Sequence, residues 1–265
     1  MNRKISVIMG VYNCSETLEE ALNCIVTQSY KNWEVIMCDD CSTDNTAAVA
    51  EQFVTKYPEQ FVLLRNEINR GLNYTLNECL KVATGDYIAR MDGDDLCDKD
   101  RFKKEIEVLE KNPEITIVST DMIFFDEEGK WGKTYTEKFP SKESFVKGTP
   151  FCHAACMVRH EAYKEVGGYS VGEKLLRVED YHLWIKMYEK GYKGMNIQEP
   201  LYFMRDDRDA QGRRKFKYRL NEAFVKAYAI KVLGLKKKKY IWCLRPIIVG
   251  MLPKWIYRTL HRKNS

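Results

Sequence analysis

Short apolar segments alternate with amphipathic segments along the first 120 residues of the chain. Each apolar segment is rich in β-branched residues and favours a strand, and each amphipathic segment favours a helix. Strands that alternate with helices at this spacing predict an α/β fold with a mostly parallel, Rossmann-like sheet covered by helices on both faces. The predicted strands are 4–10, 33–38, 61–65, 86–91 and 115–120, and the predicted helices between them begin near residues 15, 42, 71 and 98.

The remaining sequence predicts a different arrangement. A hairpin that turns at Glu128 and Gly129 is expected first, then a strand with a short helix and a glycine turn, and then an amphipathic helix. The last part is a long basic helix followed by an apolar end broken by Pro and Gly. The corresponding segments are 122–139, 154–169, 178–191 and 213–234, so we predict one domain at 1–205 and a basic helical extension at 206–265.

Carboxylates cluster where two of the predicted strands end. Asp92, Asp94 and Asp95 follow the strand at 86–91, and Asp39 and Asp40 follow the strand at 33–38. Ligands of parallel α/β sheets bind at the carboxyl ends of the strands, so both clusters are expected at one edge. Clustered oxygen ligands favour Mg²⁺ or Mn²⁺, which is often shared with substrate phosphates. The chain has neither a GxGxxG nor a GxxxxGK[ST] motif, so neither a dinucleotide site nor a P-loop is predicted.

Five motifs in order give the chain a family resemblance. They are "VIMGVYN", "VIMCDDCSTDNT", "NRGLNYTLNECLKVATGDYIARMDGDD", "VGGY" and "EDYHLWIKM". Together they resemble the inverting family 2 glycosyltransferases of the GT-A type over about residues 4–205. The resemblance implies a nucleotide-binding half at 1–95, an acceptor half at 96–205, a nucleotide-sugar donor and a Mg²⁺ or Mn²⁺ cofactor.

The resemblance also implies roles for individual residues. Asp40 is expected to accept the uracil imide hydrogen, Asp92 to bind the ribose hydroxyls, and Asp94 with Asp95 to hold the metal. Many members carry Arg where Leu76 stands here, immediately before Asn77. The expected donor-binding residues are Val11, Tyr12, Asn13, Asp40, Arg70, Asn77, Asp92, Gly93, Asp94 and Asp95.

Asp180 in the last motif matches the catalytic base of the family. It lies in the first turn of a predicted helix, where the helix dipole favours the ionised carboxylate. Such a carboxylate can take the proton of the acceptor hydroxyl. Apart from the motif, Glu179 and Asp180 are ordinary acids of a first helical turn. His153, Glu179 and Trp184 are further candidates for the acceptor pocket, although a single histidine is usually structural.

Nine scattered cysteines indicate reduced thiols in a cytoplasmic protein rather than a disulfide framework. Cys38 and Cys41 have thioredoxin-like spacing, and Cys152, His153 and Cys156 are candidates to join them in a zinc site. A thiol-redox or zinc protein is therefore an alternative to an enzyme of sugar transfer. A second alternative is a non-catalytic protein that binds nucleotide sugars with the same fold.

The tail differs in charge from the body. Residues 1–200 carry 25 Lys and Arg against 34 Asp and Glu, whereas residues 201–265 carry 18 against 4. Basic clusters alternate there with aromatic residues, and the apolar part is too short to span a bilayer. This pattern favours an anionic membrane surface over nucleic acid. Packing of the tail on the body is the alternative. The aromatic residues are Tyr240, Trp242, Trp255 and Tyr257.

We therefore predict a metal-dependent inverting glycosyltransferase. It would move a sugar from a UDP-sugar to a glycan or lipid-linked acceptor in the synthesis of a surface polysaccharide. The sequence "MNRKISVIMGVYN" begins with a strand pattern and shows no signal peptide. The expected location is the cytoplasm, peripherally on the inner face of the cell membrane.

Overall fold

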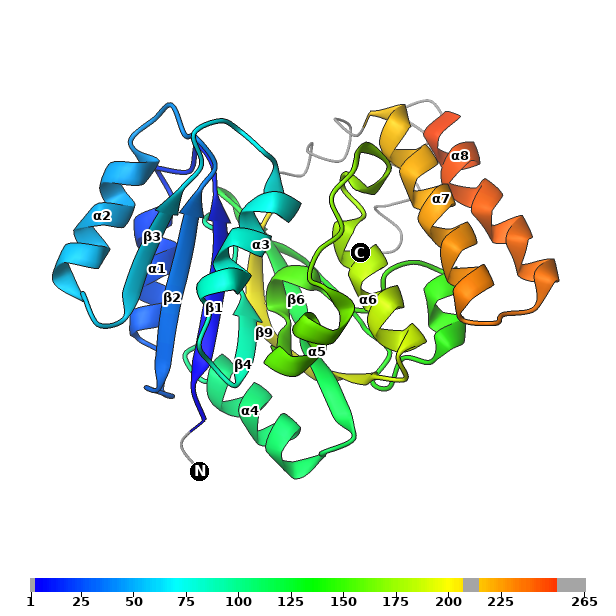
Figure 1. Cartoon of the computed structure of the whole chain (residues 1–265), viewed down its shortest axis with the longest axis horizontal. Coiled ribbons are helices and arrows are strands. Elements are labelled where there is room, and N and C mark those ends of the chain that lie inside the picture. Colours follow the sequence, from blue (N-terminus) through cyan, green and yellow to red (C-terminus); the bar gives the residue numbers. More distant parts are fainter. Residues whose placement is uncertain (1–2, 207–214, 252–265) are drawn as a thin grey trace.

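A computed structural model describes residues 3–206 and 215–251 of the chain. Within these ranges one sheet runs through the molecule with the strand order β3-β2-β1-β4-β8-β6-β9-β5, and β7 pairs with β6 beside it. Helices lie on both faces of this sheet, and a group of helices from the end of the chain lies at one side (Figure 1). The predicted α/β fold is confirmed.

The first half of the sheet is parallel, as predicted. β1 (Ile5–Val11) lies between β2 (Trp33–Asp39) and β4 (Tyr87–Arg90), and β3 (Phe61–Arg65) pairs with the outer side of β2. The helices that follow β1, β2, β3 and β5 are α1 (Leu18–Val26), α2 (Thr46–Lys56), α3 (Leu72–Val82) and α4 (Arg101–Lys111).

The second half of the sheet is mixed. β8 (Met157–Arg159) runs antiparallel between β4 and β6 (Ile115–Asp126). β6 forms the predicted hairpin with β7 (Gly129–Lys133). β9 (Lys193–Arg205) pairs in parallel with β6 and antiparallel with β5 (Leu96–Cys97). The sequence patterns did not predict β5 or β9, and the parallel order predicted for the sheet is interrupted at β8.

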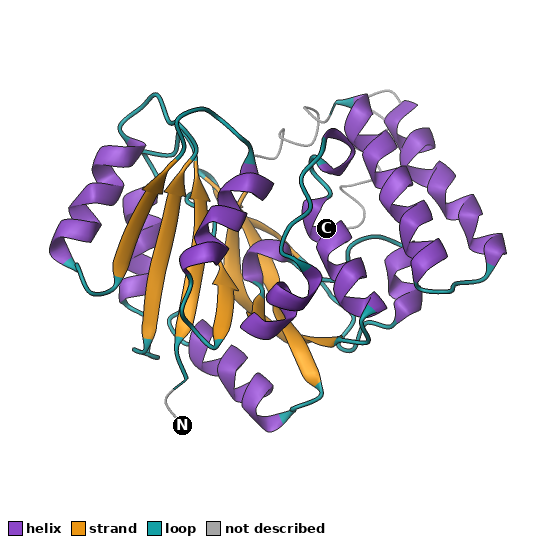
Figure 2. Cartoon of the chain, in the orientation of Figure 1, coloured by secondary structure: helices purple, strands orange, loops and turns teal. Residues whose placement is uncertain are grey.

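Apolar side chains of the strands divide between two cores. Val7 and Met9 of β1 pack in the core that α1, α2 and α4 cover, whereas Ile8 packs in the core on the other face. This second core is covered by α3, α5 (His160–Val166) and α6 (Glu179–Glu189). Successive side chains of a strand point to opposite faces, so a continuous apolar strand serves both cores. Figure 2 shows the helical layers on the two sides of the strands.

The helical extension packs partly on this body. It consists of α7 (Phe216–Val232), the 3₁₀ helix η5 (Lys237–Cys243) and α8 (Leu244–Met251). Val225 and Ala229 of α7 are fully buried in the same core as Trp184 of α6. The first helix of the extension, α7, therefore shares the hydrophobic core of the domain before it. No helix of the described ranges is both long and apolar enough to cross a membrane.

Candidate functional site

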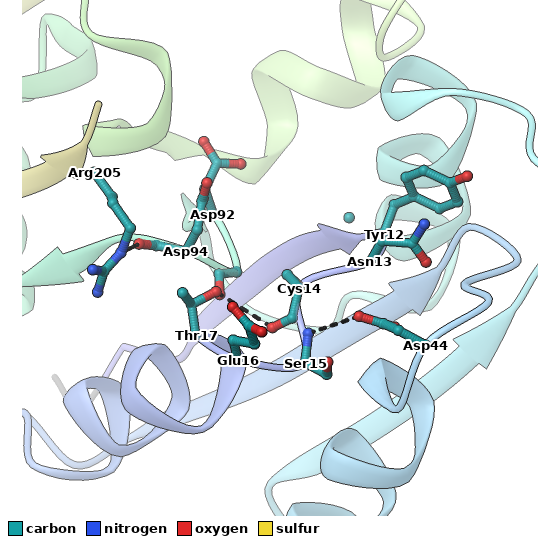
Figure 3. A pocket seen from close by; sticks show the side chains of 12 residues that line it. Tyr12, Asn13, Cys14, Ser15, Glu16, Thr17, Asp44, Asp92, Asp94 and Arg205 are labelled. Atoms are coloured by element: carbon teal, nitrogen blue, oxygen red, sulfur yellow. Dashed lines mark hydrogen bonds between the residues drawn. The ribbon is translucent and has the colours of Figure 1, made fainter. Parts of the chain in front are cut away.

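A cavity of about 530 Å³ opens at the carboxyl ends of β1 and β4. Asp92, Asp94 and Arg205 lie on one side of it, and Tyr12 and Asn13 lie on the other (Figure 3). This is the edge of the sheet at which the sequence predicted a ligand site. The lining residues are Gly10, Tyr12, Asn13, Cys14, Ser15, Glu16, Thr17, Asp44, Asp92, Gly93, Asp94 and Arg205.

The loop after β1 is held against the loop after β2. Asn13 has a positive φ of 48°, and its side-chain Oδ1 accepts a hydrogen bond of 2.8 Å from the backbone N–H of Thr43. The backbone N–H of Asn13 donates to Ser42 Oγ over 3.0 Å. These bonds leave the ring of Tyr12 49% exposed at the cavity. Val11, the third residue predicted for this wall, is buried in the core and does not line the cavity.

Gly93 lets the acidic turn approach this first loop. A Cβ atom at Gly93 would lie 2.8 Å from Cys14 Sγ, which is too close for any other residue without a shift. The carbonyl oxygen of Gly93 accepts a hydrogen bond of 2.9 Å from Thr17 Oγ1. The turn that carries Asp92 and Asp94 is therefore fixed to the start of α1.

Asp92 and Asp94 are the carboxylates of this turn that face the cavity. The pKa of Asp94 is raised, first because the surrounding protein displaces water and then because Asp92 is negatively charged. Arg205 lies beside them: its Nε donates to the backbone carbonyl of Asp94 over 3.0 Å, and its Nη2 donates to Glu20 over 2.8 Å. The sequence patterns did not indicate Arg205, because they did not predict β9, the strand that ends at this residue.

The structure corrects the prediction for Asp95. This residue is only 2% exposed and does not line the cavity. One carboxylate oxygen accepts a hydrogen bond of 2.8 Å from the hydroxyl of Tyr202, and the other accepts one of 2.7 Å from the backbone N–H of Arg205. Burial raises the pKa of Asp95 well above its ordinary value. Asp95 thus joins the acidic turn to β9 and does not share the orientation of Asp94.

Asp94 and Asp92 are the residues at the cavity that could hold a hard divalent cation. The pKa of Asp94 is raised first by burial and then by the negative charge of Asp92, and a nearby cation would act against both effects. In the part of the chain that the structure describes, no group of three or more His, Cys, Asp or Glu side chains is placed to hold a metal by itself. Mg²⁺ commonly takes its other ligands from water and from substrate phosphates.

Asp40, Arg70 and Asn77 do not line this cavity. Asp40 is 4% exposed and accepts hydrogen bonds of 2.8 and 2.7 Å from the backbone N–H groups of Arg70 and Gly71, the two residues immediately before α3. The guanidinium of Arg70 lies over the ring of Tyr74, 5.0 Å from its centre. In this structure Asp40 therefore stabilises the start of a helix.

Asn77 holds the glycine turn of the "VGGY" motif. Its side chain donates to the carbonyl of Tyr169 and accepts from the N–H of Tyr169, both over 2.8 Å. Gly168 has a φ of +64°, and a Cβ there would lie 2.6 Å from Asn77 Oδ1. Two motifs that are distant in sequence thus form one contact between α3 and the loop before α6.

Glu179 and Asp180 begin α6, as predicted. The pKa of Asp180 is raised to about 7, mainly because its carboxylate is dehydrated and also because Glu179 is negatively charged. The backbone N–H groups of Tyr181 and Asp180 partly offset this rise in the pKa. Arg177, just before the helix, has a φ of +66°, a strained conformation for a residue with a side chain. A carboxylate with a pKa near neutrality suits a general base.

His153 and Trp184 are parts of the core near this helix. Trp184 is fully buried, so its ring has no face free to stack on a sugar. His153 Nε2 shares a hydrogen bond of 2.8 Å with the hydroxyl of Tyr169. The pKa of His153 is well below its ordinary value, first because of burial and then because of the charge of Arg90. His153 is therefore a neutral, hydrogen-bonded core histidine.

The cysteines of the predicted redox or zinc motif have separate surroundings. The Sγ of Cys38 is directed at Asn66 Oδ1, 3.7 Å away, and that of Cys41 at the carbonyl of Glu67, 3.5 Å away. Cys156 Sγ donates to the carbonyl of Cys152 over 3.2 Å. These contacts weigh against a shared zinc ion and leave the cavity at the acidic turn as the best candidate site.

Comparisons with known proteins show the family of the chain. The model of the family "Glycosyl transferase family 2" matches residues 6–167. A protein of Bacillus subtilis (strain 168) with the name "Putative glycosyltransferase EpsE" is 43% identical over 261 residues, which are 98% of this chain and 94% of the relative. The Escherichia coli protein WfaP, named as a UDP-Glc:alpha-D-GlcNAc-diphosphoundecaprenol beta-1,3-glucosyltransferase, is 25% identical over 270 residues, 98% of this chain and 99% of WfaP.

A solved structure shows the same fold. The crystal structure of S. aureus TarS 1-349 in complex with UDP-GlcNAc superposes with a TM-score of 0.69 at 18% identity. The match covers 94% of this chain and 82% of the TarS chain. The fold and the resemblance predicted from the sequence are both confirmed.

Proposed function

Because the chain belongs to glycosyl transferase family 2 and is a glycosyltransferase, we propose that it transfers a sugar from a UDP-sugar to a hydroxyl group of a glycan or lipid-linked acceptor, with inversion. The observation that carries this proposal is the position of Asp92, Asp94 and Arg205 around one cavity at the carboxyl edge of the sheet. The name of WfaP, which specifies a UDP-sugar and a diphosphoundecaprenol acceptor, supports the substrate class and a role in surface polysaccharide synthesis.

The two sides of the cavity match the two ends of a nucleoside diphosphate. The exposed ring of Tyr12 offers a surface for the base, and Asn13 shapes the loop beside it. Asp92, which lines the cavity, would accept hydrogen bonds from the ribose hydroxyls. Arg205 supplies the positive charge that a diphosphate requires.

Asp94, with Asp92 beside it, is the residue that would hold Mg²⁺ or Mn²⁺. When bound, the cation would neutralise charge on the departing diphosphate. Arg205 contributes to the same stabilisation through its own guanidinium, because its side chain is bonded to the carbonyl of Asp94 and lies on the same side of the cavity.

Asp180 serves as the general base. The acceptor oxygen forms a bond to the anomeric carbon of the sugar, while the bond from that carbon to the diphosphate breaks and UDP leaves with the electron pair. The proton of the acceptor hydroxyl passes to the carboxylate of Asp180. Its pKa of about 7 makes this carboxylate more basic than an ordinary aspartate and still ionised in part at neutral pH.

The extension supports binding to the inner face of the cell membrane. Phe216, Leu220 and Phe224 follow one another at intervals of four residues on α7, and each is more than 40% exposed. Beside them η5 and α8 form an apolar hollow of about 380 Å³ lined by Ile241, Trp242, Leu244, Arg245, Ile248 and Val249. We call these nine residues the C-terminal apolar surface. Trp255 and Tyr257, two aromatic residues of the predicted membrane-binding tail, lie outside the described residues.

Lysines next to this surface give it the charge that an anionic membrane attracts. Lys236, Lys237 and Lys238 are exposed at the start of η5. Lys239 is less exposed and lies 3.9 Å from Glu143 of the body. Aromatic and aliphatic side chains bordered by lysines are typical of proteins that lie in the membrane interface.

A donor screen tests the catalytic proposal. The full chain is incubated with a panel of UDP-, GDP- and dTDP-sugars and Mn²⁺, with lipid-linked and soluble acceptors, and release of the nucleotide is measured. We expect release from a UDP-sugar only when an acceptor is present. UDP-sugar binding without any release across the panel would favour the non-catalytic alternative. Binding of none of the nucleotides would contradict the proposed donor site.

A further inference from the structure

The side chain of Arg90 is a buried charge directly behind the acidic turn. It ends β4, two positions before Asp92, and is 1% exposed. A buried guanidinium is strongly unfavourable unless charged and polar partners surround it. Its partners therefore show what the residue is placed to do.

Those partners belong to the turn. One terminal nitrogen of Arg90 forms an ion pair with the carboxylate of Asp92, and the other donates to the carbonyl of Met91. The remaining nitrogen, Nε, is buried and has no hydrogen-bond partner within the described residues. The two terminal nitrogens of the planar guanidinium thus contact adjacent residues of one turn. This forked contact fixes the carbonyl of Met91 and the carboxylate of Asp92 together.

A second buried arginine holds Arg90 itself. Arg101 of α4 is fully buried, and its Nη2 donates to the carbonyl of Arg90 over 3.0 Å. Its Nε forms an ion pair of 3.1 Å with Glu105, which is also fully buried. On the other side, the backbone N–H of Arg90 donates over 2.9 Å to the carbonyl of Cys156, the residue immediately before β8. Both ends of Arg90 are therefore attached to rigid elements.

The charge of Arg90 also reaches the helix of the proposed base. The pKa of Glu179 is raised chiefly by burial, and the positive charges of Arg177 and Arg90 act against that rise. Asp92 is 31% exposed through its side chain, whereas Arg90 is enclosed. The arrangement is a fixed cation inside the protein that orients a carboxylate at the cavity surface.

We propose that Arg90 is a positioning residue of the donor site, which holds the carboxylate of Asp92 in the orientation that binds the ribose of the nucleotide. This inference rests on the proposed function. It differs from a purely structural role, in which Arg90 would stabilise the fold and leave the affinity for nucleotide unchanged.

A double-mutant cycle tests the proposal. The dissociation constant of UDP is measured by calorimetry with Mn²⁺ for the wild type, Arg90→Gln, Asp92→Asn and the double variant. We expect Arg90→Gln to weaken UDP binding at least tenfold in the wild type and less than threefold in the Asp92→Asn background, because the residue acts through Asp92. An equal loss in both backgrounds, or no loss in either, would overturn the proposal.

Arg90→Lys replaces Arg90→Gln in this test if the glutamine variant does not fold. Lysine retains the positive charge, but it cannot contact Met91 and Asp92 together with the forked geometry of a guanidinium. We expect it to weaken UDP binding severalfold with Asp92 present and not in the Asp92→Asn background. The same affinity as the wild type in a folded Arg90→Lys variant would overturn the forked-contact explanation.

Arg159→Gln is the matched control. This arginine lies at the other end of the same strand pair, where its Nε donates to the carbonyl of Ile115 over 3.0 Å. We expect a lower melting temperature with unchanged UDP affinity, and weakened UDP binding there would overturn the assignment by showing that any lost arginine disturbs the site. A wild-type protein that does not bind UDP would instead contradict the proposed function itself.

Discussion

The hydroxyl of Tyr202 donates a hydrogen bond of 2.8 Å to the carboxylate of Asp95, across 107 positions of sequence. The same hydroxyl accepts a hydrogen bond of 3.2 Å from the backbone N–H of Asp92. One tyrosine of β9 thus supports both ends of the turn whose middle residue, Asp94, faces the cavity. The geometry of the acidic turn therefore depends on a strand from the distant end of the domain.

Replacing Tyr202 with Phe should destabilise the protein and weaken UDP binding together. The variant leaves Asp95 with one hydrogen bond fewer and Asp92 N–H without its acceptor, at a cost of about 1–3 kcal/mol. Urea unfolding and UDP calorimetry measure the two effects. Tyr188→Phe is the control, because its buried hydroxyl donates a hydrogen bond of 2.9 Å to the carbonyl of Pro140 and has no contact with the acidic turn among the described residues. It should lose stability only, and weakened UDP binding in the control would contradict a specific role of Tyr202.

Asp94 and Asp95 should behave differently towards a metal. We expect UDP to raise the melting temperature further when Mn²⁺ is present, because the cation would link Asp94 to the diphosphate. Asp94→Ala should remove this metal-dependent increment. Asp95→Asn should keep the metal-dependent increment. It should lower the melting temperature from which the increment is measured, because Asp95 is buried against Tyr202 and Arg205. Loss of the increment in a stable Asp95→Asn protein would restore Asp95 as a ligand.

These corrections show which parts of the site could be predicted from the sequence. The alternation of strands and helices is a local signal, so the parallel half of the sheet and the edge with the acidic turn could be predicted. The orientation of each aspartate could not, because it depends on contacts with β9. That strand carries a charged and a proline residue, Glu199 and Pro200, and its pairing with β6 joins residues about 80 apart, so no local pattern marks it.

The same reason explains two other differences. Arg205 completes the cavity only because β9 returns beside the acidic turn. α7 shows a basic pattern typical of an exposed helix, yet Lys226 is fully buried where it pairs with Glu222 over 3.1 Å and donates to the carbonyl of Lys147 over 3.2 Å. The sequence alone does not distinguish a lysine that is buried and paired from one that is exposed to water.

Asp180→Asn should reduce the rate of transfer and leave donor binding intact. The amide keeps the shape of the carboxylate and cannot accept the proton of the acceptor, so kcat should fall by roughly 10²–10⁴-fold. Steady-state kinetics and UDP calorimetry separate the two properties. A rate close to that of the wild type would place the base elsewhere, with Glu179 as the first candidate.

The pH dependence of kcat should report the charge of Glu179. Asp180 must be ionised to act as the base, and its pKa is raised to about 7. The value of kcat should therefore rise with pH through about pH 7 and then level off. Glu179→Gln removes a negative charge that raises the pKa of Asp180. The ascending limb of the profile should therefore move to lower pH. A profile from pH 5 to 9 for both proteins measures the shift. An unmoved limb would show that Glu179 does not act on the base.

Binding to membranes should depend both on the C-terminal apolar surface and on the lysines next to it. Trp242→Ser with Ile248→Ser removes inserting side chains that are 44% and 58% exposed, and Lys236, Lys237 and Lys238→Ala removes about 1 kcal/mol of attraction per lysine. Co-sedimentation with anionic liposomes should fall in both variants, but added salt should weaken only the binding that the lysines provide. Tyr135→Ser with Phe139→Ser is the control, since these residues are 83% and 57% exposed on the body and away from α8 in sequence. If the control and the Trp242 variant sediment alike, the surface does not bind membranes.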